Sequence, residues 1–235
     1  MRYSCLACDF DGTLATGAKV SGSTLAALER VVASGRKLIL VTGREMHELL
    51  PIFPEHVIFE RIVGENGAVL YRPASRETMV LADPPSKKFV AALRDLRVEP
   101  LSVGRSVVAT PRANDAKVLR VIRELGLELQ VIYNKDGVMV LPPGVDKGTG
   151  LLAALAELGI SQRNTVGIGD AENDHALLSV CECGVAVANA IPALKERADL
   201  TTAEPNGKGV EELIEKLLLN DLADVKSQPS RHRNV

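Results

Sequence analysis

The sequence of 235 residues has no tryptophan and few aromatic side chains, which make up 3% of the chain. Proteins that bind single-stranded nucleic acid stack the bases on aromatic rings, so this composition argues against such a surface. The chain also has almost no excess charge, with a formal net charge of −2 at pH 7. Proteins that bind nucleic acid or anionic membranes usually carry a strong positive excess. We therefore expect neither nucleic acid nor a membrane among the partners of this protein.

Long apolar runs are absent as well. No run approaches the roughly 18 residues that a membrane-spanning helix needs. The apolar stretch near the N-terminus is short and is interrupted by Asp9, so it does not have the pattern of a signal peptide. A cytoplasmic protein is expected, and nothing in the sequence indicates its oligomeric state.

Cysteine is also scarce, with four residues in two close pairs, Cys5/Cys8 and Cys181/Cys183. The first pair lies in a strand-like run, where side chains alternate between the two faces. A separation of three residues puts Cys5 and Cys8 on opposite faces, so they cannot share one metal ion. We expect buried thiols rather than a zinc or redox site.

What the sequence does contain is an ordinary globular composition, with 46% hydrophobic and 25% charged residues. These values exclude a disordered chain, a collagen and a disulfide-rich mini-protein. Apolar strand-like runs alternate with amphipathic helix-like segments, which predicts an α/β fold with a mostly parallel, Rossmann-like sheet. The predicted strands are residues 4–8, 37–41, 57–63, 165–168 and 184–187, with a hairpin formed by 68–71 and 78–81. The predicted helices are one from Ser21 or Ser23 to Gly35, then 45–50 (stopped before Pro51), 147–158, 173–180, 191–197 and 209–218.

Two proline-containing breaks, at 83–85 and 141–144, enclose a segment of different charge. Residues 84–145 carry a net charge of +4, whereas the remainder carries −6. We expect residues 84–145 to form a small α+β module on two stiff hinges, inserted into a discontinuous core of residues 1–83 and 146–220. Residues 221–235 are expected to form a flexible tail. The elements predicted in the insert are helices at 86–96 and 113–125, a strand at 105–110 and a hairpin formed by 128–133 and 138–141.

Polar side chains follow several predicted strands of the core, at the end where sites form in open parallel sheets. Asp9 and Asp11 follow the first strand, Thr42-Gly43-Arg44 follows the second, and Asp170 follows the strand after the insert. Asp174 opens the next helix, and Lys147 stands at a helix start just past the second hinge. Several carboxylates in one crevice need a cation, and an all-oxygen cluster selects a hard ion, so Mg²⁺ is expected. A hard cation, an ammonium, a hydroxyl and backbone N–H groups together suit a phosphoryl group.

These residues resemble the four ordered motifs of the haloacid dehalogenase-like (HAD) phosphatases, in the branch with a type-C2 cap. The segments that carry the resemblance, over residues 3 to 215, are Asp9-Phe10-Asp11-Gly12-Thr13, Thr42-Gly43-Arg44, Lys147 and Gly169-Asp170-Ala171-Glu172-Asn173-Asp174, with Glu65-Asn66-Gly67-Ala68 and Val187-Ala188-Asn189-Ala190 in support. The insert is small, as in the archaeal-type phosphoglycolate phosphatases and the sucrose-phosphate phosphatases. The resemblance implies an enzyme that hydrolyses small phosphorylated metabolites, such as phosphoglycolate or sugar phosphates, through an aspartyl-phosphate intermediate.

The resemblance also implies roles for individual residues. Asp9 would be the nucleophile, and Asp11 the general acid and base that also gives a backbone carbonyl to Mg²⁺. Asp170 would bind the metal directly, and Asp174 would hold the metal shell. The phosphate-binding residues would be Thr42, Gly43, Lys147 and Asn173. Residues 84–145 would be the cap that selects the substrate, faced by Arg44 and Asn66.

The same residues also fit simpler structural roles. Each aspartate could be a turn or helix-cap residue, Arg44 could form a surface ion pair, and Asn66 could serve a turn first. The four histidines have no metal-ligand spacing, and no Walker A or dinucleotide-binding pattern is present, so neither ATP nor a dinucleotide is expected. Three alternatives to a free-standing phosphatase are a phosphosugar mutase, a phosphate-binding regulatory module without catalysis, and one domain of a longer protein.

Overall fold

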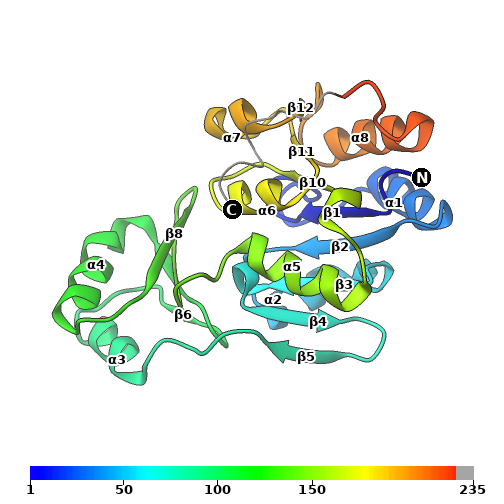
Figure 1. Ribbon diagram of the computed structural model, residues 1–235. Coiled ribbons are helices and arrows are strands. Elements are labelled where there is room, and N and C mark those ends of the chain that lie inside the picture. The colour runs from blue at the N-terminus through cyan, green and yellow to red at the C-terminus, as the bar shows by residue number, and fades with distance from the viewer. Residues whose placement is uncertain (226–235) are drawn as a thin grey trace.

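The computed structural model describes residues 1–225, and its core is a single eight-stranded sheet with the order β12-β11-β10-β1-β2-β3-β4-β5 (Figure 1). All neighbours from β12 to β3 are parallel, and the β3–β4 and β4–β5 pairs are antiparallel. The predicted α/β fold with a mostly parallel sheet is therefore confirmed. The strands are β1 (Cys5–Asp9), β2 (Lys37–Val41), β3 (Arg61–Gly64), β4 (Val69–Arg72), β5 (Glu77–Val80), β10 (Thr165–Gly169), β11 (Cys183–Ala186) and β12 (Leu200–Thr201).

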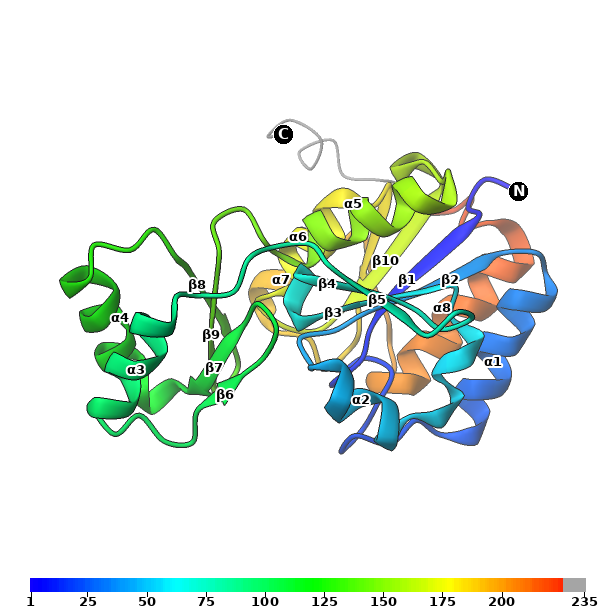
Figure 2. The same cartoon turned by 90° about the horizontal axis from the view of Figure 1, so that it is seen from below.

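Helices cover both faces of this sheet. In Figure 2, α1 (Gly22–Ala33), α2 (Met46–Ile52) and α8 (Asn206–Asn220) lie on one face, and α5 (Lys147–Leu158) and α6 (Asp174–Val180) lie on the other. The helix α7 (Pro192–Arg197) completes the core. Because both faces are covered, β1 and most of β2 are buried apolar runs. All four cysteines are buried thiols, as predicted, and burial raises the pKa of Cys5 to about 12.

Local signals explain where the main helices begin. The Ser21 side chain accepts a hydrogen bond from the backbone N–H of Thr24, which caps α1 at one of the two predicted positions. Helix α5 begins with a reciprocal capping box between Asp146 and Thr149, and it ends at Gly159 in the left-handed conformation.

A second, four-stranded antiparallel sheet with the order β6-β7-β9-β8 lies beside the main sheet (Figure 1). Helices α3 and α4 pack on it, and the two layers enclose their own apolar core around Phe89, Leu93 and Val118. All these elements fall within the predicted insert, residues 84–145. They are α3 (Lys87–Asp95), β6 (Ser102–Val103), β7 (Val108–Pro111), α4 (Asp115–Glu124), β8 (Gln130–Asn134) and β9 (Gly137–Leu141).

Some sequence-based boundaries were wrong. The helix expected to stop before Pro51 continues to Ile52, because the missing N–H removes only one bond near the end of a short helix whose Phe53 N–H still reaches Leu49. The strand expected at 57–63 begins only at Arg61, since Pro54 starts a 3₁₀ turn over Pro54–Ile58. The two-residue strands β6 and β12 are too short to give an alternation signal. Of the predicted tail, 221–225 is described, whereas 226–235, with His232, lies outside the described residues.

Candidate active site

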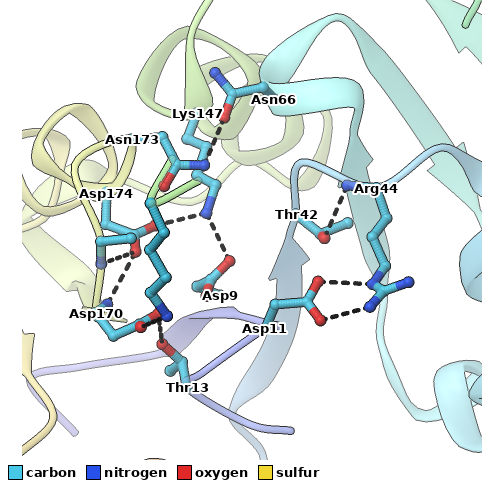
Figure 3. Close-up of polar contacts among 12 residues, drawn as sticks. Asp9, Asp11, Thr13, Thr42, Arg44, Asn66, Lys147, Asp170, Asn173 and Asp174 are labelled. Carbon is cyan, nitrogen blue, oxygen red and sulfur yellow. Dashed lines mark hydrogen bonds and ion pairs between the residues drawn. The ribbon is translucent and has the colours of Figure 1, made fainter. Parts of the chain in front are cut away.

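Three buried aspartates gather at the carboxyl edge of the main sheet. Asp9 is the last residue of β1, Asp170 follows β10, and Asp174 is the first residue of α6. Because β1 and β10 are parallel neighbours, their ends meet at one edge (Figure 3). One carboxylate oxygen from each of the three residues lies within 4.8 Å of the others.

Lys147 places a buried ammonium between two of these carboxylates. Its Nζ lies 2.6 Å from Oδ1 of Asp9 and 2.7 Å from Oδ1 of Asp174. Burial alone would lower the pKa of Lys147, but Asp174 and Asp9 raise it above its ordinary value. Burial and the charge of Asp174 raise the pKa of Asp9, and Lys147 opposes this shift. The ammonium is therefore the main protein group that favours an ionised Asp9.

Asp174 is held by the backbone of the preceding loop. Its Oδ2 accepts hydrogen bonds from the N–H groups of Asp170 (2.9 Å) and Ala171 (3.0 Å). The approach is so close that a Cβ on Gly169 would lie 2.5 Å from Cγ of Asp174. With Oδ1 bound to Lys147, both oxygens of Asp174 are occupied, so this residue fixes the geometry of its neighbours.

Asp170 is also fully buried, and it has partners from two distant segments. Thr13 donates its hydroxyl to Oδ1 (3.1 Å), and Lys135 of the second sheet places Nζ 2.6 Å from Oδ2. Thr13 belongs to the loop after β1, where Gly12 has a φ of +86°. A Cβ on Gly12 would overlap Oδ2 of Asp170, so the glycine lets the loop backbone approach this carboxylate closely.

The donor set fits a hard divalent cation. Three buried carboxylates converge with one buried ammonium, so the cluster keeps a negative charge that burial makes unfavourable. Asp9 and Asp170 each offer carboxylate oxygens, and no sulfur or imidazole belongs to the group of ligand atoms found among residues 1–225. Oxygen-only sites of this kind suit hard divalent cations such as Mg²⁺, Ca²⁺ and Mn²⁺.

Asp11 lies apart from this cluster, and its side chain is 40% exposed. Arg44 holds both of its carboxylate oxygens, from Nε (2.6 Å) and from Nη2 (2.7 Å) (Figure 3). The hydrogen bonds to Asp11 raise the pKa of Arg44. The backbone N–H of Arg44 donates to Oγ1 of Thr42 (3.1 Å), so the Thr42 hydroxyl can donate its own hydrogen to a ligand.

Asn66 and Asn173 form a buried amide pair beside the cluster. Nδ2 of Asn173 donates to Oδ1 of Asn66 at 2.9 Å, and Asn66 itself is fully buried in the turn Glu65–Gly67. Nδ2 of Asn66 and Oδ1 of Asn173 have no hydrogen-bond partner among the described residues. Asn66 therefore serves both a turn and the orientation of Asn173.

A cavity of about 260 Å³ opens between the main sheet and the second sheet. Its lining joins Asp9, Asp11, Gly43 and Arg44 to residues of the β8–β9 hairpin. The remaining lining residues are Glu48, Ala109, Asn134, Gly137, Val138 and Met139. Five further predicted site residues do not line the cavity but lie next to it, through contacts with its lining or with one another. They are Thr42, Lys147, Asp170, Asn173 and Asp174.

Comparison with known proteins agrees with this geometry. A family model described as haloacid dehalogenase-like hydrolase matches residues 6–102 and 107–214. The chain belongs to the haloacid dehalogenase-like (HAD) hydrolases. Within the HAD family it is a phosphatase, so the family resemblance noted in the sequence is confirmed.

Two curated relatives carry the name phosphoglycolate phosphatase. "Phosphoglycolate phosphatase 2" of Saccharolobus solfataricus is 39% identical over 132 residues, which cover 56% of this chain and 55% of that protein. "Phosphoglycolate phosphatase" of Methanothermobacter thermautotrophicus is 28% identical over 227 residues, which cover 91% of this chain and 98% of that protein. The match to the first relative thus spans about half of its length, and the match to the second spans nearly all of it.

Solved HAD structures share the fold. A haloacid dehalogenase-like hydrolase from Bacteroides thetaiotaomicron has a TM-score of 0.77 at 21% identity and covers 92% of this chain and 99% of its own. A HAD/Cof-like hydrolase from Plasmodium vivax has a TM-score of 0.80 at 19% identity, with 92% and 96% covered. No helix within residues 1–225 is long and apolar enough to cross a membrane.

Sequence reasoning missed three residues of this HAD site: Thr13, Lys135 and Glu65. Thr13 is part of the first HAD motif, so its place beside Asp170 could have been inferred from that motif. Lys135 was assigned to a hairpin turn, and Glu65 was treated as part of a supporting segment. Both contact partners that are distant in the sequence, and no local pattern signals such contacts.

Proposed function

We propose that this protein is a Mg²⁺-dependent phosphatase of small phosphorylated metabolites, with phosphoglycolate as the first candidate substrate and sugar phosphates as the next. The observation that carries the proposal is the buried Asp9–Lys147–Asp174 arrangement beside Asp170, at a cavity of about 260 Å³. A cavity of this size suits a small ester. The names of the archaeal relatives support phosphoglycolate in particular.

Asp9 and Asp170 would hold the metal with carboxylate oxygens, together with the backbone carbonyl of Asp11. Asp174 would hold the metal shell, because it connects Lys147 to the loop N–H groups beside Asp170. When bound, Mg²⁺ supplies positive charge to the phosphoryl oxygens and keeps Asp9 ionised.

In the first step, a carboxylate oxygen of Asp9 attacks phosphorus and the ester P–O bond breaks. The leaving oxygen takes a proton from Asp11, and an aspartyl-phosphate forms on Asp9. Lys147 and the Thr42 hydroxyl hold the phosphoryl oxygens, and Asn173 supports them from its pair with Asn66. In the second step, Asp11 takes a proton from water, the water oxygen attacks phosphorus, and inorganic phosphate leaves as Asp9 is restored.

Arg44 holds the Asp11 side chain in place. Both Asp11 oxygens accept hydrogen bonds from Arg44, so the guanidinium would have to turn away before the carboxyl group could reach a leaving oxygen. Arg44 also lines the cavity, where an anionic substrate would attract it. Substrate binding would therefore free the Asp11 side chain to approach the leaving oxygen.

Residues 84–145 would act as a cap over a core formed by residues 1–83 and 146–220. The β8–β9 hairpin already supplies one wall of the cavity. Cap closure would keep bulk water from the aspartyl-phosphate, and cap opening would admit the substrate.

The test is phosphate release from phosphoglycolate, p-nitrophenyl phosphate and a panel of sugar phosphates, with Mg²⁺ and with EDTA. Asp9→Asn should lower kcat by at least about 10³-fold. Asp95→Asn, at an exposed position on α3, is the matched control and should retain the wild-type rate. Turnover by Asp9→Asn at the wild-type rate, or without any divalent ion, would contradict the proposal. Transfer of phosphate between sugars without release would favour a mutase.

A further inference from the structure

Glu65 is a buried carboxylate that the proposed reaction does not use. It follows β3 on the main sheet, yet its side chain binds three consecutive residues of the predicted cap. Oε1 accepts the backbone N–H of Arg105 (3.1 Å), and Oε2 accepts those of Ser106 (2.8 Å) and Val107 (3.2 Å). Successive N–H groups that converge on one point form a concave anion site, and here the anion comes from the core of the same chain.

The surroundings of this contact are closely packed. A Cβ on Gly104 would lie 2.7 Å from Oε2 of Glu65 and 3.0 Å from Cδ of Glu45. Ser102 donates its hydroxyl to Glu45, and Ser106 donates its hydroxyl to the backbone carbonyl of Ala82. A buried carboxylate is unfavourable unless it is hydrogen-bonded, so Glu65 strongly favours the docked arrangement of this cap loop.

The backbone of the same turn is strained. Glu65 and Asn66 have φ values of +48° and +55°, in the left-handed region that side-chain-bearing residues rarely adopt, and Gly67 has +111°. Strain of this kind persists only where the surrounding contacts enforce it. A Cβ on Gly67 would overlap the backbone carbonyl of Asp146, so only glycine fits there.

The turn joins the cap to the phosphate-binding side of the proposed active site. Asn66 binds Asn173 through its side chain, and its backbone N–H donates to the carbonyl of Thr42 (3.0 Å). Gly67 packs on Asp146, which is the residue before Lys147. Three neighbouring residues thus contact the cap loop, the buried asparagine and the start of the helix that carries the ammonium.

We propose that Glu65 is a positioning residue, which docks the cap on the core and, through the strained turn Glu65–Gly67, couples cap docking to the placement of Asn173. This inference rests on the proposed phosphatase function. Loss of the Glu65 contacts lets the turn relax and moves the Asn66 amide. The cap wall of the cavity and the asparagine beside the phosphoryl site then shift together.

The experiment compares the wild-type enzyme with Glu65→Gln, which keeps the size of the side chain but turns an N–H₂ group toward backbone donors. Hydrogen exchange of the Arg105–Val107 amides should accelerate by about 10-fold or more, and kcat on phosphoglycolate should fall by roughly 10-fold at temperatures where the variant is folded. Glu55→Gln, at an exposed position on the core, should change neither quantity.

A second variant, Gly104→Ala, disturbs the same contact from the cap side and leaves the acid intact. It should also accelerate exchange of the Arg105–Val107 amides and lower kcat. The double variant of Glu65→Gln and Gly104→Ala should change both quantities little more than either single variant, because both substitutions disrupt the same interaction. A lower melting temperature with unchanged amide exchange and unchanged kcat would mean a purely structural role and would overturn the inference, as would full additivity. Absence of any turnover by the wild type would instead contradict the proposed function, and the exchange result would still test the docking contact.

Discussion

The properties of single side chains in this protein follow from how charge is buried. Lys147 is enclosed between Asp9 and Asp174, and all three side chains are buried. An ammonium in this place is favourable only because two carboxylates surround it. In the same way, burial of each carboxylate charge is favourable only because the ammonium lies beside it.

Lys147→Met should therefore harm both stability and activity. The change leaves two buried carboxylates facing each other without a cation, which should lower the free energy of unfolding by about 3–5 kcal/mol. Urea unfolding would measure this loss. The value of kcat should also fall by about 10²-fold or more, because the variant lacks the positive charge that would contact the phosphoryl oxygens. The exposed Lys88→Met is the control. Equal stability of the two variants would show that Lys147 is not needed to balance these acids.

Lys135→Met should strengthen Mg²⁺ binding. The ammonium of Lys135 binds Asp170, the same carboxylate that we assign to the metal, so two cations compete for one group. Its side chain is 48% exposed, and solvent weakens the competition, so the gain in affinity should be about 3- to 10-fold. Calorimetric titration of both proteins with Mg²⁺ would measure it. Unchanged or weaker binding would mean that Lys135 and the metal do not share Asp170.

At the scale of helices and strands, ion pairs connect α5 to the antiparallel edge of the sheet. Glu157 near the end of α5 accepts hydrogen bonds from Arg72 of β4 and from Arg61 of β3. The hydrogen bond from Arg72, followed by that from Arg61, lowers the pKa of Glu157.

This shift predicts a pH-dependent contribution to stability. The folded-state pKa of Glu157 lies below the unfolded value of about 4.3, so the stabilisation is present above that pH and is lost as the pH falls through the folded pKa. Glu157→Gln should cost about 0.5–1 kcal/mol at pH 7, because the pairs are partly exposed. The difference from wild type should shrink as the pH drops below 4. Urea unfolding across this range would measure it, and a difference that grows in acid would contradict the assignment.

The elements also show how far the sequence could predict the fold. The predicted ranges of β2 and α5 match the structure residue for residue, because an unbroken apolar run and a capping residue with spaced leucines are local signals. The strand β3 was misplaced because Val57 and Ile58 have strong strand propensity, yet Pro54 starts a 3₁₀ turn before them. In the site, the residues that follow strands were foreseeable from strand order. The contacts of Glu65 and Lys135 were not, since they depend on how the second sheet docks on the first.

At the scale of the whole molecule, each sheet has its own main apolar core, and a small cluster of Ala68 with Val107, Met139 and Leu141 joins the two parts. Phe89, Leu93, Val118 and Val121 pack between the second sheet and its helices, whereas the core of the main sheet forms around β1 and β2. Separate cores allow one part to loosen while the other remains folded.

Phe89→Ala should test this independence. Removal of a fully buried phenylalanine costs about 3–5 kcal/mol, and the loss should fall on the cap alone. Hydrogen exchange should accelerate in α3, α4 and β9 while β1 and β10 keep their protection. Phe59→Ala, in the core of the main sheet, is the matched comparison and should give the reverse pattern. Uniform acceleration throughout residues 1–225 in both variants would show that the two parts unfold as one unit.

The route by which the chain leaves the cap adds a mechanical requirement. Strand β9 ends at Leu141 and α5 begins at Lys147, so a short tether, residues 142–146, joins the second sheet to the buried ammonium. A displacement of residues 142–146 would move Lys147 unless contacts within this segment held it in place. The capping box of Asp146 with Thr149, and the close contact of Asp146 with Gly67, anchor the tether one residue before the ammonium. Lys147 is therefore fixed from two sides, by the anchored residue before it and by the carboxylates of Asp9 and Asp174.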